Sequence, residues 1–251
     1  VCSSDLNMVS KGLCKYPIAW AAKQAEGMVC DWFVCLTASG GSMRDDNGNW
    51  IFNDENGVAG LNLMVDSIKN GNADPGSINY TDREVLNPFM AGDIPFVLNW
   101  AFAYALADNP EESTIAGNVG IGLVPSNSDG VVSSSVTGSG GFAIASTSKY
   151  PDYAWKLLEN VLSRESLFKA AEIASNMPPI RSIYEDEEFI EQFPTMAAAY
   201  PQFEYAQPRP ALSKYSEWSN NMQVSLHEAV TGSKSVEDAL NEMIEKSAAY
   251  Q

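Results

Sequence analysis

The chain contains 251 residues, of which 45% are hydrophobic, as is typical of a globular protein with one large domain or two modest ones. Its 32 acidic residues outnumber its 15 lysines and arginines and give a net charge of −17. This balance argues against nucleic acid or an anionic membrane as the partner, because both attract cations. The sequence also has no run of the roughly eighteen apolar residues that a transmembrane helix needs.

The four cysteines are Cys2, Cys14, Cys30 and Cys35. Their spacing does not match a zinc site, and His227 is the one histidine that could assist them. Cys30 and Cys35 lie in an apolar run, so we expect buried free thiols there, with a disulfide as the alternative. The sequence therefore predicts no metal site.

Residues 1–6, Val-Cys-Ser-Ser-Asp-Leu, have neither the pattern of a signal peptide nor that of a helix or strand start. The nucleotides GTG TGC TCT TCC GAT CT can encode them, and this string resembles a translated sequencing-adapter end. We therefore expect residues 1–6 to be a non-native leader in front of a chain that is truncated at its N-terminus.

Helical and strand patterns alternate along the chain, which predicts an α/β protein. A helical rhythm within residues 16–39 stops at Gly40, and the acidic turn at residues 45–49 does not fit a calcium loop. Asn53 or Asp54 can cap the next helix, which Asn70 closes. Further helices are expected near residues 82–91, 151–163, 165–175, 185–193, 196–200, 217–230 and 235–248. Strands are expected at residues 50–52, 94–99, 118–124 and 142–145.

No set of residues in the sequence has the pattern of a catalytic site. His227 falls within a predicted helix, where a structural role is more common than a role as general base. Ser139 lies in Thr-Gly-Ser-Gly-Gly and ahead of a predicted strand, unlike a nucleophile elbow. Acidic pairs such as Glu187 and Glu188 are typical of a solvated surface. We predict no catalytic residue and no cofactor.

Aromatic and glycine residues instead gather at predicted strand boundaries. Trp100 directly follows the strand at residues 94–99, and Gly140-Gly141-Phe142 leads into another strand. Arg209 lies between two prolines, which restrict its backbone. Sugar rings have apolar faces and hydroxyl rims, so a site for them needs aromatic platforms together with charged or amide groups. Packing in the core is the alternative role for Trp100 and Phe142.

Several segments occur in the same order as in one family of binding proteins. They are residues 24–30 (QAEGMVC), 89–93 (FMAGD), 97–104 (VLNWAFAY), 119–125 (VGIGLVP), 140–144 (GGFAI), 177–181 (MPPIR) and Arg209-Pro210 with Tyr215. From about Tyr16 to its end, the chain resembles the C-terminal two-thirds of family 1 extracellular solute-binding proteins, of the maltose/trehalose-binding type.

The resemblance implies a type II periplasmic-binding-protein-like fold with two lobes. Residues 7–137 and 195–251 would form one largely complete lobe, and residues 138–194 would form part of the other. Residues 133–141 and 193–201 are the expected hinge segments.

The resemblance also implies a carbohydrate site formed by Trp100, Gly140, Gly141, Phe142, Arg209, Glu26, Gln24 and Tyr215. The indole would stack on a sugar ring, and the glycines with Phe142 would line the hinge side. Arg209 would donate hydrogen bonds to sugar hydroxyls, whereas Glu26 and Gln24 would accept them. The chain departs from the family at Phe142, where a tryptophan is common, and at Ala25, where a tyrosine is frequent.

The expected function is the capture of a di- or oligosaccharide outside the cytoplasm, by a monomer that is lipid-anchored or periplasmic. Closure of the lobes around the ligand would be recognised by the permease of an ABC importer. A carbohydrate-active enzyme and a scaffold module without a ligand remain the alternatives, and a binding experiment with a panel of sugars distinguishes them.

Overall fold

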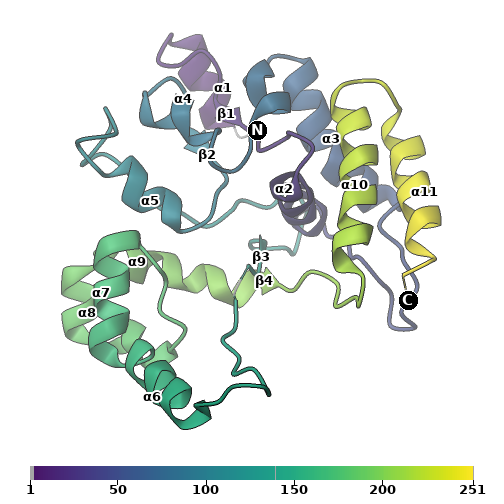
Figure 1. Cartoon of the computed structure of the whole chain (residues 1–251). Helices are drawn as coiled ribbons and strands as arrows, with labels where there is room; N and C mark the ends of the chain where they lie inside the picture. The colour runs from purple at the N-terminus through teal and green to yellow at the C-terminus, as the bar shows by residue number, and fades with distance from the viewer. Residues whose placement is uncertain (1–2, 139, 251) are drawn as a thin grey trace.

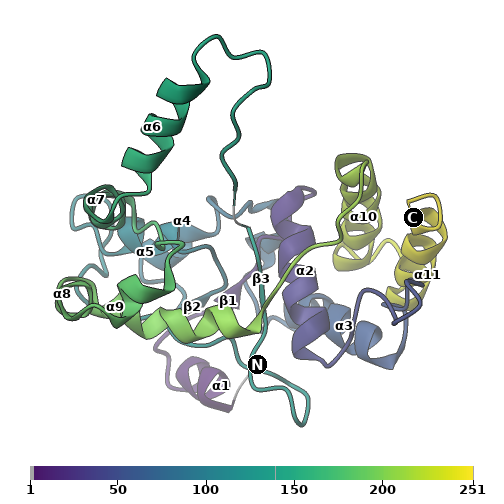
Figure 2. The same cartoon turned by 90° about the horizontal axis from the view of Figure 1, so that it is seen from below.

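The computed structural model describes residues 3–138 and 140–250 of the chain. Its elements form two groups that are connected through short strands (Figures 1 and 2). The first group contains α2 (Glu26–Ala38), α3 (Glu55–Lys69), α10 (Tyr215–Val230) and α11 (Val236–Ser247). The second contains α6 (Pro151–Val161), α7 (Arg164–Ala174), α8 (Glu187–Gln192) and α9 (Pro194–Ala199).

Helix α2 is the centre of the first group, because every residue from Met28 to Ala38 is buried. Helices α3 and α10 pack against it, and Gly60 lets α3 approach closely, since a Cβ there would come within 3 Å of the α2 backbone at Leu36. Trp32 and Trp218 are fully buried in the resulting core. Burial of large aromatic side chains of this kind contributes most of the stability of such a core.

The second group has a separate and smaller core, formed by Leu167, Ala171, Ile183, Tyr184, Phe189 and Met196. Its aromatic rings meet edge to face, tilted or stacked, and the Tyr184 and Tyr200 rings stack with their centroids 4.3 Å apart. Helix α6 contributes no buried residue to this core and exposes Tyr153 and Leu157. The two cores share no buried residue.

The strands are two residues long and pair in parallel. Strand β1 (Ile18–Ala19) pairs with β2 (Phe96–Val97), and β3 (Ser135–Val136) pairs with β4 (Ala206–Gln207). The second pair connects the two groups (Figure 1). The remaining elements are α1 (Ser3–Ser10), η1 (Pro75–Asn79), α4 (Leu86–Met90), α5 (Phe102–Ala107), η2 (Arg181–Glu185) and η3 (Tyr200–Tyr205).

The strand predictions at residues 118–124 and 142–145 are wrong, because both segments are coil in the described structure. Neither has a neighbouring strand to complete its backbone hydrogen bonds. The first predicted helix begins only at Glu26, after β1, and residues 50–52 form a single bridge between Trp50 and Arg44. Residues 3–6, for which no helix start was expected, lie within α1, while Cys2 and Ser139 fall outside the described residues.

Other predictions are confirmed. Asp54 caps α3 through a hydrogen bond from the Gly57 amide, and helices occupy the predicted segments from α6 to α11. Cys30 and Cys35 are buried free thiols. None of the described helices is both long and apolar enough to cross a membrane.

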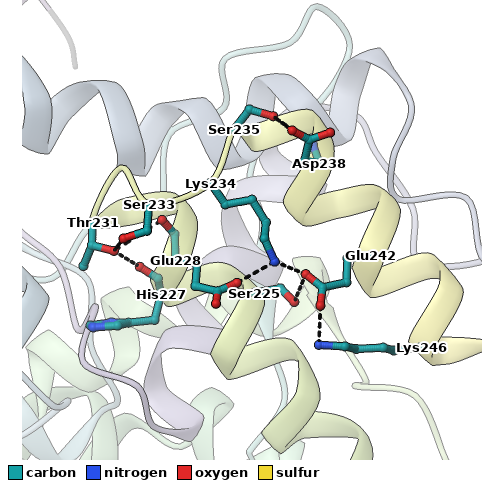
Figure 3. A network of polar contacts seen from close by, with 10 residues as sticks. All are labelled: Ser225, His227, Glu228, Thr231, Ser233, Lys234, Ser235, Asp238, Glu242 and Lys246. Carbon is teal, nitrogen blue, oxygen red and sulfur yellow. Dashed lines mark hydrogen bonds and ion pairs between the residues drawn. The ribbon is translucent and has the colours of Figure 1, made fainter.

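A network of charged side chains connects α10 to α11 (Figure 3). Lys234, in the connection between them, contacts Glu228 at 2.5 Å and also binds Glu242. Glu242 additionally binds Lys246 at 2.7 Å. Hydrogen bonds from Lys234 and Lys246 lower the pKa of the Glu242 carboxyl to about 2. The stabilisation of the folded state by this carboxylate is therefore fully present above its ordinary pKa of 4.5, and it is lost as the pH falls towards 2.

We expect Lys234→Met to lower the free energy of unfolding by about 1–2 kcal/mol at neutral pH, because two carboxylates then lose their charged donor. The measurement is urea denaturation. Lys214→Met is the matched control, since both partners of the Lys214–Glu217 pair are more than half exposed, and it should cost less than about 0.5 kcal/mol. Equal losses for both variants would contradict a stabilising role of this network.

Candidate functional site

The candidate site lies at one end of the β3–β4 pair. The strands are parallel, with Val136 opposite Gln207, and a hydrogen bond of 2.9 Å from the Thr137 amide to the Gln207 carbonyl extends the pair. Gly138 and Arg209 therefore leave the strands at the same, carboxyl end. In α/β proteins, ligands commonly bind at the carboxyl ends of parallel strands.

Trp100 reaches this end through contact with Gly138, since a Cβ at Gly138 would collide with the indole ring. The Trp100 amide donates to Asn99 Oδ1 at 2.8 Å, and Asn99 Nδ2 donates to the carbonyl of Asp82 at 2.6 Å. The Trp100 carbonyl accepts from Ala103 where α5 starts. The ring is half-buried, so one part of it packs on the connecting strand and another part can contact a ligand.

Glu26, the first residue of α2, collects three side-chain donors. Its Oε1 accepts from Arg209 Nη1 and from the Tyr215 hydroxyl, each at 2.5 Å. Its Oε2 accepts from Ser219, which in turn accepts from Gln223 Nε2 at 3.0 Å. Both carboxylate oxygens are therefore engaged by the protein, and Glu26 holds Arg209 and Tyr215 in place.

The electrostatics of this cluster favour hydrogen bonding over nucleophilic chemistry. Burial raises the pKa of the Cys30 thiol to about 12, although the nearby Arg209 opposes this shift. The thiol is therefore neutral at physiological pH and a poor nucleophile. Burial, followed by the hydrogen bond to Glu26, also raises the pKa of Tyr215, which keeps its hydroxyl protonated. Glu26 compensates the charge of Arg209, so the cluster suits an uncharged ligand with hydroxyl groups.

The remaining residues proposed from the sequence lie in more open positions. Gln24 is exposed in the turn before α2. A Cβ at Gly140 or Gly141 would meet no atom within 4 Å, and Phe142 is 69% exposed. The structure thus brings together Glu26, Arg209 and Tyr215, and places Trp100 at the same strand end. It leaves Gln24 and the 140–142 segment apart from the contacts of Glu26.

Sequence reasoning missed the supporting residues Ser219 and Gln223. Together with Tyr215 they recur every four residues on α10, which places them on one face of the helix. That spacing was a usable signal. Gly138, by contrast, leaves space for the indole ring of Trp100, and this role becomes apparent only from the packed structure.

Asp31 was also missed, and it supports the loop in front of the site. Its side chain is 7% exposed and accepts a hydrogen bond from the Ala21 amide at 3.0 Å. Burial raises the pKa of its carboxyl from 3.8 to about 7, the Ala21 amide acts in the opposite direction, and the nearby Asp82 raises it further. The buried side chain of Asp31 thus connects α2 to the segment that carries Gln24 and leads into Glu26.

Residues 11–198 match the family model described as bacterial extracellular solute-binding protein, and the chain belongs to this family. The "Probable ABC transporter-binding protein" of Deinococcus radiodurans is 29% identical over 214 residues, which make up 83% of this chain and 50% of that protein. The chain therefore spans half the length of this relative.

Two solved structures have a fold similar to that of this chain. Maltose-bound MalE3 of T. maritima has a TM-score of 0.84 at 26% identity, over 97% of this chain and 62% of that chain. An ABC transporter solute-binding protein of Agrobacterium radiobacter K84, in complex with ribitol, has a TM-score of 0.81 at 21% identity, over 96% and 63%. These similarities confirm the predicted periplasmic-binding-protein-like α/β fold. The chain covers less than two-thirds of either protein.

We expect Asp31→Asn to change how stability depends on pH. The folded-state pKa lies above the unfolded value, so the wild-type protein loses stability as the pH rises from 3.8 to about 7. This loss is on the order of 1 kcal/mol per pH unit. Asparagine has no charge to desolvate and can still accept from Ala21, so the variant should lack this slope. Urea denaturation across this pH range measures it, and parallel curves for both proteins would contradict the prediction.

We expect Glu26→Gln to lower the free energy of unfolding by about 1–2 kcal/mol, because two charge-assisted hydrogen bonds are weakened and Arg209 loses its counter-charge. Gln24→Ala, two residues away and exposed, is the control and should change it by less than about 0.5 kcal/mol. Urea denaturation at pH 7 compares them. If Gln24→Ala and Glu26→Gln lower the free energy of unfolding equally, Glu26 does not organise the cluster.

Proposed function

We propose that this chain forms part of an extracytoplasmic binding protein that captures a neutral di- or oligosaccharide for an ABC importer. The observation that carries the proposal is the pairing of a half-buried indole, Trp100, with an arginine that Glu26 holds at the same end of a parallel strand pair. A stacking platform next to a fixed hydrogen-bond donor matches the apolar faces and hydroxyl rims of sugars.

The similar structures support a carbohydrate or polyol as the ligand class. One relative was solved with maltose and another with ribitol. We propose a maltose- or trehalose-like ligand, with Arg209 and Tyr215 contacting its hydroxyls and Gly140, Gly141 and Phe142 lining the hinge side. Because Glu26 binds three protein donors, its main role in this proposal is to orient Arg209. Gln24, which is exposed, accepts from the ligand.

We propose further that two lobes close around the ligand. Residues 7–137 and 195–251 form one lobe, and residues 138–194 belong to the other, with hinges at residues 133–141 and 193–201. The separation of the two cores supports two lobes, with Met196 of the second core lying within the proposed hinge segment at residues 193–201. The protein acts as a monomer, either lipid-anchored or periplasmic, and the closed form is what the permease of the importer recognises.

Titration calorimetry of the complete protein that contains this chain, with maltose, trehalose, ribitol and glucose, tests the proposal. Saturable binding of at least one sugar, without release of reducing sugar, is the expected result. Release of reducing sugar would replace it with an enzymatic function. The absence of binding to every sugar, combined with capture of a protein partner, would favour a scaffold module.

We expect Trp100→Ala to weaken binding of the preferred sugar about tenfold or more, because the stacking surface is lost. Trp155→Ala is the matched control, since Trp155 is 58% exposed on α6 and hydrogen-bonds to Glu159. It should leave the affinity unchanged. Calorimetry measures both variants, and an unchanged affinity of Trp100→Ala would assign the indole to packing alone.

A further inference from the structure

Asn99 lies between β2 and α5, directly before Trp100. Its half-buried side chain makes two hydrogen bonds in different directions. Oδ1 accepts from the Trp100 amide at 2.8 Å, and Nδ2 donates to the carbonyl of Asp82 at 2.6 Å. A carboxamide can accept and donate at once, whereas an aspartate of the same shape can only accept. Asn99 therefore connects the backbone of Trp100 to a turn that lies 17 positions earlier in the chain.

The turn that accepts this bond, residues 80–84, is closed by hydrogen bonds of its own. The Thr81 amide donates to Glu84 Oε2 at 2.9 Å, and the Glu84 amide donates back to Thr81 Oγ1 at 3.3 Å. This is the reciprocal pattern of a capping box. The Lys23 amide donates to the Tyr80 carbonyl at 3.0 Å. The turn is therefore held together internally and attached to the segment in front of α2.

The same turn also packs against the start of α2. A Cβ at Gly27 would lie 3.6 Å from Asp82, so the turn contacts the helix one residue after Glu26. On its other side, the guanidinium of Arg83 lies 5.1 Å from the ring centroid of Phe102, the first residue of α5. The turn thus lies between the two parts of the proposed site, the N-terminus of α2 and the segment that carries the indole.

The other contacts of Trp100 do not connect it to α2. Its carbonyl accepts from the Ala103 amide at 3.0 Å, which is a local bond at the start of α5. Its ring packs on Gly138, which lies in the proposed hinge segment at residues 133–141. Contact with Gly138 alone would let the ring follow the hinge when it bends. The bond from Asn99 to Asp82 holds the residue to the first group of helices instead.

We infer that Asn99 is a positioning residue, which attaches Trp100 to the turn at residues 80–84 so that the indole keeps one orientation relative to Arg209 while the hinge bends. The inference rests on the proposed sugar-binding function and names the residue that prepares its stacking surface. A ligand that meets an indole already in place binds with a smaller loss of side-chain freedom. Asn99 itself does not contact the ligand, so its effect on affinity passes through Trp100.

Fluorine NMR of the complete protein that contains this chain, labelled with fluorotryptophan, tests the orientation without a ligand. The Trp100 resonance is assigned by its absence in Trp100→Phe. We expect Asn99→Ala to shift and broaden this resonance. Asn99→Asp should do the same, because aspartate keeps the acceptor for the Trp100 amide but has no donor for the Asp82 carbonyl. Asn87→Ala, at an exposed position on α4, is the control and should leave the spectrum unchanged.

A double-mutant cycle in sugar binding tests the path from Asn99 to the ligand. Calorimetry of the same protein with its preferred sugar measures each affinity. Asn99→Ala should weaken binding about three- to tenfold, the cost of ordering one side chain on binding. The same change should have no further effect in the Trp100→Ala background. The unfolding temperature of each variant shows that the fold is kept.

Each other outcome has a distinct meaning. If neither Asn99 variant changes the Trp100 resonance, or if Asn99→Ala alone changes it, the bond to Asp82 does not hold the indole and the inference is refuted. Unchanged affinity of Asn99→Ala, or an equal loss with and without the indole, would also refute it, while the proposed function stands. If the wild type binds none of the sugars, the proposed function fails and this inference fails with it; changed fluorine spectra would then assign Asn99 to the packing of Trp100 alone.

Discussion

The rest of this structure depends on the burial of α2 on all sides. Because α3, α10 and β3 all pack against it, the helix cannot shift without opening the main core. Ser134, directly before β3, donates to the Val34 carbonyl at 3.1 Å, which attaches the connecting segment to the same helix. Glu26 stands at the start of this immobile element, so its carboxylate is a fixed point in a region otherwise made of turns and connections.

The ion pair between Glu26 and Arg209 contributes to orientation more than to stability, whereas the hydrogen bonds from Tyr215 and Ser219 to Glu26 add to stability. Its pair with Arg209 is partly exposed, with 40% and 26% of the two side chains accessible, and pairs of this kind contribute little net free energy. Arg209, however, comes from a connection between two prolines and has no helix to direct its side chain. A charged partner fixed on α2 removes that freedom in advance, which in the proposed function lowers the entropic cost of binding a ligand.

Much of the helical part of the fold could be predicted from local patterns, since caps such as Asp54 and Ser235 act within one turn. The strands could not be predicted from local patterns. Residues 118–124 have a strand-like composition without a pairing partner in the described structure, whereas the two-residue strands exist only through pairing across long sequence separations. The same holds for the site, because Glu26 and Arg209 lie 183 positions apart. The chemistry of Trp100 and Arg209 makes them candidates from the sequence alone, but the residues that orient them become apparent only from the packing.

The two proposed ligand contacts also lie next to the short strands that connect the two groups. Strands β3 and β4, each two residues long, connect the two groups. The Gln202 side chain adds a second connection, because it accepts a hydrogen bond from the Val124 amide and donates one to the Ser134 carbonyl. A short strand pair bends more easily than either core deforms. Trp100 packs on Gly138 just beyond β3, and Arg209 lies just beyond β4. A sugar that contacts both therefore acts directly on the segments that must bend in the proposed closure, so no intermediate element is needed to couple binding to movement.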